Sequence, residues 1–61
     1  MKVESELKKL KFKELYDLIY GGQLLRFVRK EALRTDTHPS VILMLVIREY
    51  RKKVKDMAAR N

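Results

Sequence analysis

The sequence predicts an all-α protein, with three short helices per chain and two chains dimerised through the third helix. The first observation is size, because 61 residues with 46% hydrophobic content make one folded domain and leave no room for a second. The second is punctuation, since only Gly21-Gly22 and the polar cluster at 35–40 are turn signals. The third is periodicity, because apolar residues between these signals recur at helical spacing. We therefore expect a single small helical domain over residues 1–61.

The first predicted helix covers residues 4–20. Its apolar side chains fall on one broad stripe, which comprises Leu7, Leu10, Leu15, Leu18 and Ile19. Lys11 interrupts this stripe. Residues 14–20 are also compatible with a short strand, because aromatic and branched side chains suit a pleated sheet. The sequence leaves the choice between helix and strand open for this segment.

The second predicted helix covers residues 22–34 and has two contrasting faces. Apolar side chains share one face: Leu24, Leu25, Phe27, Val28 and Ala32. Basic side chains occupy the other face, with only Leu33 among them: Arg26, Arg29, Lys30 and Arg34. Glu31 lies on the apolar side, so no carboxylate balances this basic arc. Like charges repel at i,i+4 spacing, so the arc differs from an ordinary solvated helix face, which mixes charges of both signs.

The third predicted helix covers residues 38–58 and opens with a start signal. Thr37 or Ser40 can accept hydrogen bonds from free backbone N–H groups. Pro39 is compatible with a helix only in the first turn, where its missing N–H is not needed. Asp36 adds a negative charge near the positive end of the helix dipole. These residues predict a helix start close to residue 38.

The run at 41–47 is apolar in every direction, so it must be covered all round. Two short neighbouring helices cannot enclose it, and we therefore expect a symmetric dimer centred on this run. The residues of this predicted dimer interface are Val41, Ile42, Leu43, Met44, Leu45, Val46, Ile47 and Tyr50. Ile42, Leu43, Val46, Ile47 and Tyr50 are expected to pack one way, and Val41, Met44 and Leu45 the other. The run has seven residues, whereas a membrane-spanning helix needs roughly 20.

Residues able to carry catalysis are scarce. The chain has no Cys and one His, His38, which directly precedes a proline, so no nucleophile and base can pair. Glu31, Asp36 and His38 lack the spacing of metal ligands, and Gly21-Gly22 lacks the pattern of a phosphate loop. We therefore expect no enzyme, no cofactor and no metal. The polar N-terminus has no signal-peptide core, and the absence of Cys suits a reducing compartment, so we expect a cytoplasmic protein.

Charge is the strongest functional signal. The formal net charge is +7, of which residues 1–20 contribute +1 and residues 21–61 contribute +6. The basic residues that we expect to contact phosphates of duplex DNA are Arg26, Arg29, Lys30, Arg34, Arg48, Arg51, Lys52 and Lys55. Tyr16 and Tyr20 could stack on bases, but aromatic residues at helical spacing are more typical of a core or its rim.

Two apolar patterns follow each other across the polar turn. They read Leu24-Leu25-x-Phe27-Val28-Arg29-Lys30-x-Ala32 and Ser40-x-Ile42-Leu43-x-x-Val46-Ile47-x-Glu49-Tyr50. In these patterns residues 24–53 resemble the two-helix portion of ribbon-helix-helix repressors of the Arc and CopG type. The resemblance implies a fold in which the second of these helices forms an intertwined dimer core.

The same resemblance implies how DNA would be held. Free amides at the start of the second helix would anchor phosphates, and Thr37, His38 and Ser40 take that position here. The family reads bases with a short N-terminal strand, which corresponds to residues 15–20. Neither alternate set of side chains in this segment resembles a base-reading surface, so we assign no base contacts to it.

We therefore expect a small non-enzymatic DNA-binding transcriptional regulator that acts as a homodimer, with basic helix faces on phosphates. The alternative is a protein-interaction module, such as an anti-repressor or adaptor, that docks its apolar helix onto a different protein. A third possibility is a scaffolding component that packages nucleic acid by charge and assembles beyond a dimer.

Overall fold

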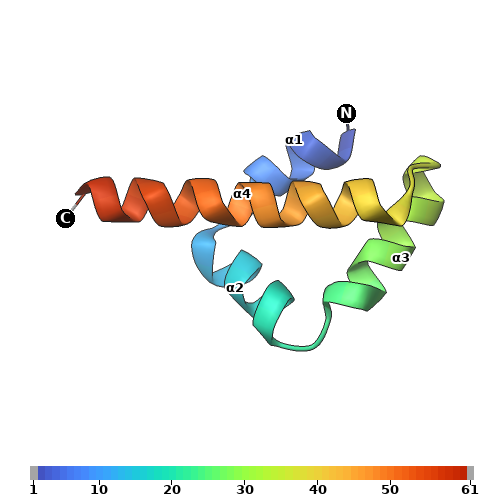
Figure 1. Cartoon of the computed structure of the whole chain (residues 1–61), viewed down its shortest axis with the longest axis horizontal. Helices are drawn as coiled ribbons and strands as arrows, with labels where there is room; N and C mark the ends of the chain where they lie inside the picture. The colour runs from blue at the N-terminus through green and yellow to red at the C-terminus, as the bar shows by residue number, and fades with distance from the viewer. Residues whose placement is uncertain (1, 61) are drawn as a thin grey trace.

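The computed structural model describes residues 2–60, and within them the protein is all-α, as predicted. The helices are α1 (Lys2–Lys8), α2 (Phe12–Tyr20), α3 (Leu24–Thr35) and α4 (Pro39–Arg60). Figure 1 shows α4 as a long rod that crosses the whole molecule, with α1 along one edge of it and α2 and α3 along the other. The molecule is flat, with extents of 38 × 24 × 16 Å.

The first predicted helix is wrong as a single element, because the chain breaks it at residues 9–11 into α1 and α2. Tight three-residue turns end α1, where Leu10 N–H donates to the Leu7 carbonyl at 3.1 Å. Lys11 is extended, with φ −78° and ψ 161°, and its N–H donates to the Glu14 carboxylate at 3.0 Å, which caps α2. No strand forms at 14–20 or elsewhere in the part of the chain that the structure describes.

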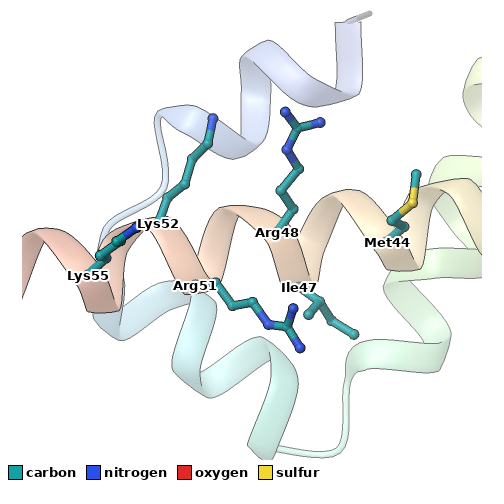
Figure 2. Close-up of a pocket in the computed structure, with 6 residues that line it drawn as sticks. All are labelled: Met44, Ile47, Arg48, Arg51, Lys52 and Lys55. Atoms are coloured by element: carbon teal, nitrogen blue, oxygen red, sulfur yellow. The ribbon is translucent and has the colours of Figure 1, made fainter.

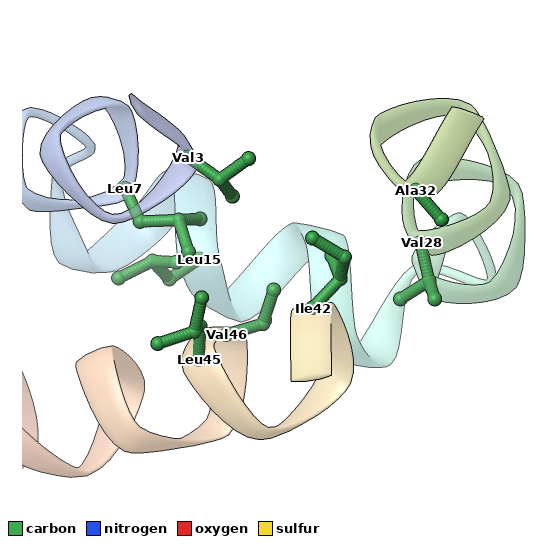
Figure 3. Close-up of a cluster of buried hydrophobic side chains, with 8 residues drawn as sticks. All are labelled: Val3, Leu7, Leu15, Val28, Ala32, Ile42, Leu45 and Val46. Atoms are coloured by element: carbon green, nitrogen blue, oxygen red, sulfur yellow. The ribbon is translucent and has the colours of Figure 1, made fainter. Parts of the chain in front are cut away.

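The break at residues 9–11 lets α1 and α2 pack against α4 from two directions. Every helix contributes to the buried core, which consists of Val3, Leu7, Leu15, Val28, Ala32, Ile42, Leu45 and Val46. Figure 3 shows Leu7 and Leu15 gathered next to Leu45 and Val46 of α4, with Val28 and Ala32 of α3 beyond Ile42. Three helices therefore pack on α4 instead of the two that the sequence predicted, so a single chain encloses much of the apolar run at 41–47.

The turn between α2 and α3 forms at the predicted glycines. Gly21 N–H donates to the Asp17 carbonyl at 2.7 Å, and a Cβ added at Gly21 would collide with that carbonyl oxygen. Gly22 has φ +82°, a conformation that L side chains rarely adopt. Both positions therefore require glycine, and the prediction of a turn here is confirmed.

The turn between α3 and α4 differs from the prediction in one detail. Asp36 adopts the left-handed conformation, with φ 51° and ψ 44°, and Thr37 N–H donates to the Ala32 carbonyl at 3.0 Å, which ends α3. Pro39 is the first residue of α4, as expected. The residue that caps α4 is His38, since its Nδ1 accepts the Ser40 N–H at 3.1 Å.

Candidate nucleic-acid interface

The side of α4 that no other helix covers carries the candidate site. Met44 and Ile47 lie on this side with 58% and 36% of their surface exposed. The side chains that line a shallow groove here are Met44, Ile47, Arg48, Arg51, Lys52 and Lys55. Figure 2 shows them spreading from α4 to both sides of its axis. We call these residues the bare face of α4.

The cations of the bare face have no acidic neighbour within it. They share one side of the helix because they follow i, i+3, i+4 and i+7 spacing: Arg48, Arg51, Lys52 and Lys55. Among residues 2–60, no carboxylate forms an ion pair with them. The acidic residues of α4 lie elsewhere, since Glu49 is buried beside Lys53 and Asp56 lines a different groove.

This arrangement works against the helix that carries it. Arg48 and Lys52 are one turn apart, as are Arg51 and Lys55. Each such like-charged pair destabilises an exposed helix by about 0.2–0.5 kcal/mol. An anion bound on the bare face would remove this repulsion, so the arrangement is typical of a surface that receives negative charge from outside the chain.

The basic arc of α3 is exposed, as predicted, at Arg26, Arg29 and Lys30. Leu25 was expected on the apolar face but is 71% exposed. Figure 1 shows the reason, because α3 begins away from α4 and approaches it only toward its end. The buried residues of α3 accordingly lie in its middle and second half.

Arg34 is a correction to the predicted phosphate-binding set, because its guanidinium already has two carboxylate partners. Arg34 Nε and an Nη donate to the two Glu31 oxygens at 2.8 Å each. The same Nη donates to Glu6 at 2.7 Å, which links α3 to α1. Sequence reasoning found Glu31 on the apolar side but missed Glu6, since no local pattern connects residues 28 positions apart.

The pKa values of this cluster follow from its hydrogen bonds. The Arg34 guanidinium lowers the pKa of the buried Glu31 carboxyl below its ordinary value, and desolvation opposes this effect only in part. Glu31 in turn raises the pKa of Arg34. Both groups therefore stay charged at neutral pH, and we assign Arg34 to the stability of the fold.

The predicted dimer residues divide into three groups by burial. Ile42, Leu45 and Val46 are buried in the core of their own chain, so they offer no surface to a second chain. Val41 and Leu43 are partly buried and pack against this core. Met44 and Ile47 alone among the run at 41–47 are exposed. The expected division of the run is corrected accordingly, because Leu45 faces the core and Ile47 faces solvent.

Tyr50, also expected at the dimer interface, packs within its own chain. Its ring stacks on Phe12 with centroids 5.5 Å apart and meets the edge of Tyr20 at 6.1 Å. Burial raises the pKa of Tyr50, and the neighbouring Tyr20 adds to this effect. These contacts fix α2 on α4, and the i,i+4 spacing of aromatic residues in α2 was the signal for such a cluster.

The start of α4 is not a free anion site. Pro39 has no N–H, Ser40 N–H donates to the His38 ring, and Val41 N–H donates to the His38 carbonyl at 3.0 Å. Two of the three residues that the ribbon-helix-helix resemblance assigns to phosphate, Thr37 and Ser40, thus have their N–H groups bonded within the chain. These bonds argue against phosphate anchoring at those two amides.

Other chemistries find little support in the described residues. Within residues 2–60, no group of three or more His, Cys, Asp or Glu side chains is arranged to hold a metal ion. Nor does any helix in this range combine the length and the apolar character needed to cross a membrane.

Comparison of the chain with protein-family models, with curated proteins and with solved structures finds no match. The short strand of the ribbon-helix-helix repressors is also missing, because its expected place is occupied by α2 (Phe12–Tyr20). The function must therefore be argued from the charges and geometry of the surface itself.

Proposed function

We propose that this protein is a small non-enzymatic DNA-binding regulator whose bare face contacts the phosphate backbone. The observation that carries the proposal is the separation of charge around α4. Cations gather on the uncovered side without an ion-pair partner among residues 2–60, whereas Glu49 and Asp56 lie on other sides. A surface strip of one sign attracts a polyanion over a distance and raises its association rate.

The bare face suits a contact with backbone phosphates. A helix of 22 residues is about 33 Å long, so α4 is a straight support for evenly spaced cations. Each cation placed against a phosphate releases condensed counterions, and the entropy of that release drives binding without regard to sequence. We include Arg26, Arg29 and Lys30 of α3 as further phosphate contacts, because they are exposed and lack ion-pair partners within residues 2–60.

We also infer a homodimer, for two reasons. The chain exposes 4885 Å², whereas a compact monomer of this mass exposes about 4,200 Å². Met44 and Ile47 supply apolar surface at the end of the bare face nearest the α3–α4 turn. A contact limited to this end would leave Arg51 and Lys55 accessible, because they lie one to two turns further along α4.

Titration of duplex DNA at several salt concentrations tests the proposal. We expect the logarithm of the binding constant to fall linearly with the logarithm of salt concentration. The double variant Arg51→Gln, Lys55→Gln should reduce the slope by about 2 for each chain bound, which corresponds to roughly 0.9 for each lost phosphate contact. Binding should weaken similarly for all duplex sequences, since phosphate contacts set affinity and not sequence choice.

The matched control removes the same charge from a different groove. Lys9 and Lys11 line a groove with Asp56, on a side of α4 that shares no residue with the bare face. The double variant Lys9→Gln, Lys11→Gln should leave the slope within error of the parent. Equal slopes for both double variants would show that net charge alone governs binding. A flat salt dependence, or no binding in dilute buffer, would contradict the proposal outright.

A second candidate function is a protein-interaction module, and exposed leucines on α3 favour it. Leu25 and Leu33 are 71% and 86% exposed on α3, and docking onto a partner protein would bury this apolar surface. Sedimentation separates the two functions. A stable dimer at micromolar concentration supports the DNA-binding regulator, whereas a loosely folded monomer that orders only with another protein supports the module.

A further inference from the structure

Two tyrosines of α2 are far more exposed than a packing role requires. Tyr16 and Tyr20 have 47% and 65% of their surface exposed. They are one helical turn apart, and their ring centroids lie 4.8 Å from each other at an interplanar angle of 41°. The two rings therefore form one continuous aromatic surface that is open to solvent.

Residues other than Tyr16 hold α2 in place. Leu15 is completely buried, and Leu18 and Ile19 pack against the core. Phe12 stacks on Tyr50 with an interplanar angle of 20° and so joins the start of α2 to α4. The aromatic contacts of Tyr16 in the described structure are to Phe12 and Tyr20, both on its own helix. Its ring thus contributes little to the docking of α2.

The tyrosines lie beside the bare face of α4. Tyr20 contacts Tyr50 of α4 at 6.1 Å, and Ile47 of the bare face is one turn before Tyr50. In Figure 2, the side chains of Ile47 and Arg51 extend toward the side of α4 on which α2 lies. The helix that carries the two tyrosines therefore lies on the flank of α4 toward which Ile47 and Arg51 extend.

We propose that Tyr16 and Tyr20 stack on unpaired bases, so that the nucleic acid bound to the bare face is single-stranded at this point. The inference rests on the proposed function and narrows its ligand. A base within a duplex has both of its faces covered by neighbouring bases and offers neither to a protein side chain. A cationic groove flanked by exposed aromatic rings is the combination that binds single strands, since phosphates follow the cations and bases lie on the rings.

This ligand explains both features of the surface together. The cations alone would bind both a duplex and a single strand through phosphates. The exposed tyrosines alone would have no cationic surface beside them to hold the nucleic-acid backbone. With a single strand, the backbone follows Arg48, Arg51, Lys52 and Lys55, and bases on its α2 side reach Tyr16 and Tyr20. Stacking of this kind tolerates any base, so we expect little sequence preference.

The experiment compares a labelled oligothymidylate of about a dozen nucleotides with the duplex that it forms with oligoadenylate, at one salt concentration. We expect the single strand to bind more tightly. The chain has three Tyr and no Trp, so quenching of its intrinsic tyrosine fluorescence by the unlabelled strand reports stacking directly. The duplex should produce little quenching.

The variants separate stacking from packing. Tyr16→Leu, Tyr20→Leu removes both stacking surfaces and should weaken single-strand binding roughly tenfold or more, while duplex binding and the salt slope stay unchanged. Tyr16→Phe, Tyr20→Phe keeps both ring faces and should bind as the parent does. Should the double leucine variant unfold, Tyr16→Leu alone answers the question, because the ring of Tyr16 has aromatic contacts only within α2.

The failures can be told apart. Equal affinity for the single strand and the duplex, with no effect of the leucine variants, overturns the stacking proposal and leaves the proposed function intact. No binding to either ligand at low salt overturns the proposed function itself. A change of sedimentation in the leucine variants without DNA would assign the tyrosines to an interface between copies and would also overturn stacking.

Discussion

The covered side and the bare face of α4 belong to one helix but have opposite character. Ile42 and Ile47 are the same residue, five positions apart, yet Ile42 is completely buried and Ile47 is 36% exposed. Glu49 is buried on the covered side, whereas Arg48 and Arg51 are exposed in the groove on the other. The apolar run at 41–47 therefore does not determine its own environment. What determines it is which side α1, α2 and α3 reach.

Exchange of each isoleucine for alanine is the most severe test of this comparison. Ile42→Ala should destabilise the fold by about 2–5 kcal/mol, because it removes methyl groups from a filled core and leaves a cavity. A domain of this size has a total stability of about 3–9 kcal/mol, so this variant should lose a large part of its stability. Ile47→Ala should change the stability of a single chain by no more than about 0.5 kcal/mol, at a protein concentration too low for dimers to form. Urea unfolding followed by circular dichroism measures both.

The pair of variants also reports on a partner. If Ile47→Ala destabilised the protein as strongly as Ile42→Ala, the two sides of α4 would be equally covered in solution. A loss of stability in Ile47→Ala that grew with protein concentration would show that a second copy of the chain covers the bare face. Equal and concentration-independent losses would mean that the arrangement of the helices around α4 is wrong.

Acid should weaken the carboxylate cluster around Arg34, which links α3 to α1. Arg34 lowers the pKa of Glu31 from its ordinary value of 4.5, so the ionised carboxylate stabilises the folded state. This contribution to stability is fully present above pH 4.5 and is lost as the pH falls through the lowered pKa of Glu31. The urea midpoint should therefore fall on strong acidification, by less than the effect of Ile42→Ala.

Two glutamine variants assign that acid effect to a residue. Glu31→Gln should lower stability at neutral pH and should reduce the further loss in acid, because the titrating group has been removed. Glu6→Gln breaks only the exposed arm of the same cluster and should have a smaller effect, since exposed ion pairs contribute little. Identical acid profiles for the parent and Glu31→Gln would exclude Glu31 as the group responsible.

Two of the predicted helices correspond closely to the structure, because glycines and a proline mark their ends. Residues 22–34 became α3 (Leu24–Thr35), and residues 38–58 became α4 (Pro39–Arg60). The break at residues 9–11 could not be predicted from such signals, since Lys9, Leu10 and Lys11 are all compatible with a helix. Only the packing of Leu7 and Leu15 against α4 from two directions explains it.

The candidate site could be predicted in part. Helical spacing alone placed Arg48, Arg51, Lys52 and Lys55 on one side, and the structure leaves that side uncovered. Helical spacing could not show that Arg34 is held by Glu6, because that contact depends on how α1 lies against α3. Nor could it show that Tyr16 and Tyr20 are exposed, because the same spacing also occurs in buried helices.

The smallest effect on stability is expected at the start of α4, which belongs neither to the covered side nor to the bare face. His38 caps the helix through the bond from Ser40 N–H to its Nδ1, so His38→Ala should destabilise the fold by about 0.5–1 kcal/mol. His38→Asn keeps a side-chain hydrogen-bond acceptor at the capping position and should retain the parent stability. Thermal unfolding at one protein concentration measures both variants. Neither should alter the salt dependence of DNA binding, because the amides of this helix end are bonded within the chain. A weaker salt slope for His38→Ala would instead mean that the helix start contacts phosphate, and the bare face would then have to be extended to include it.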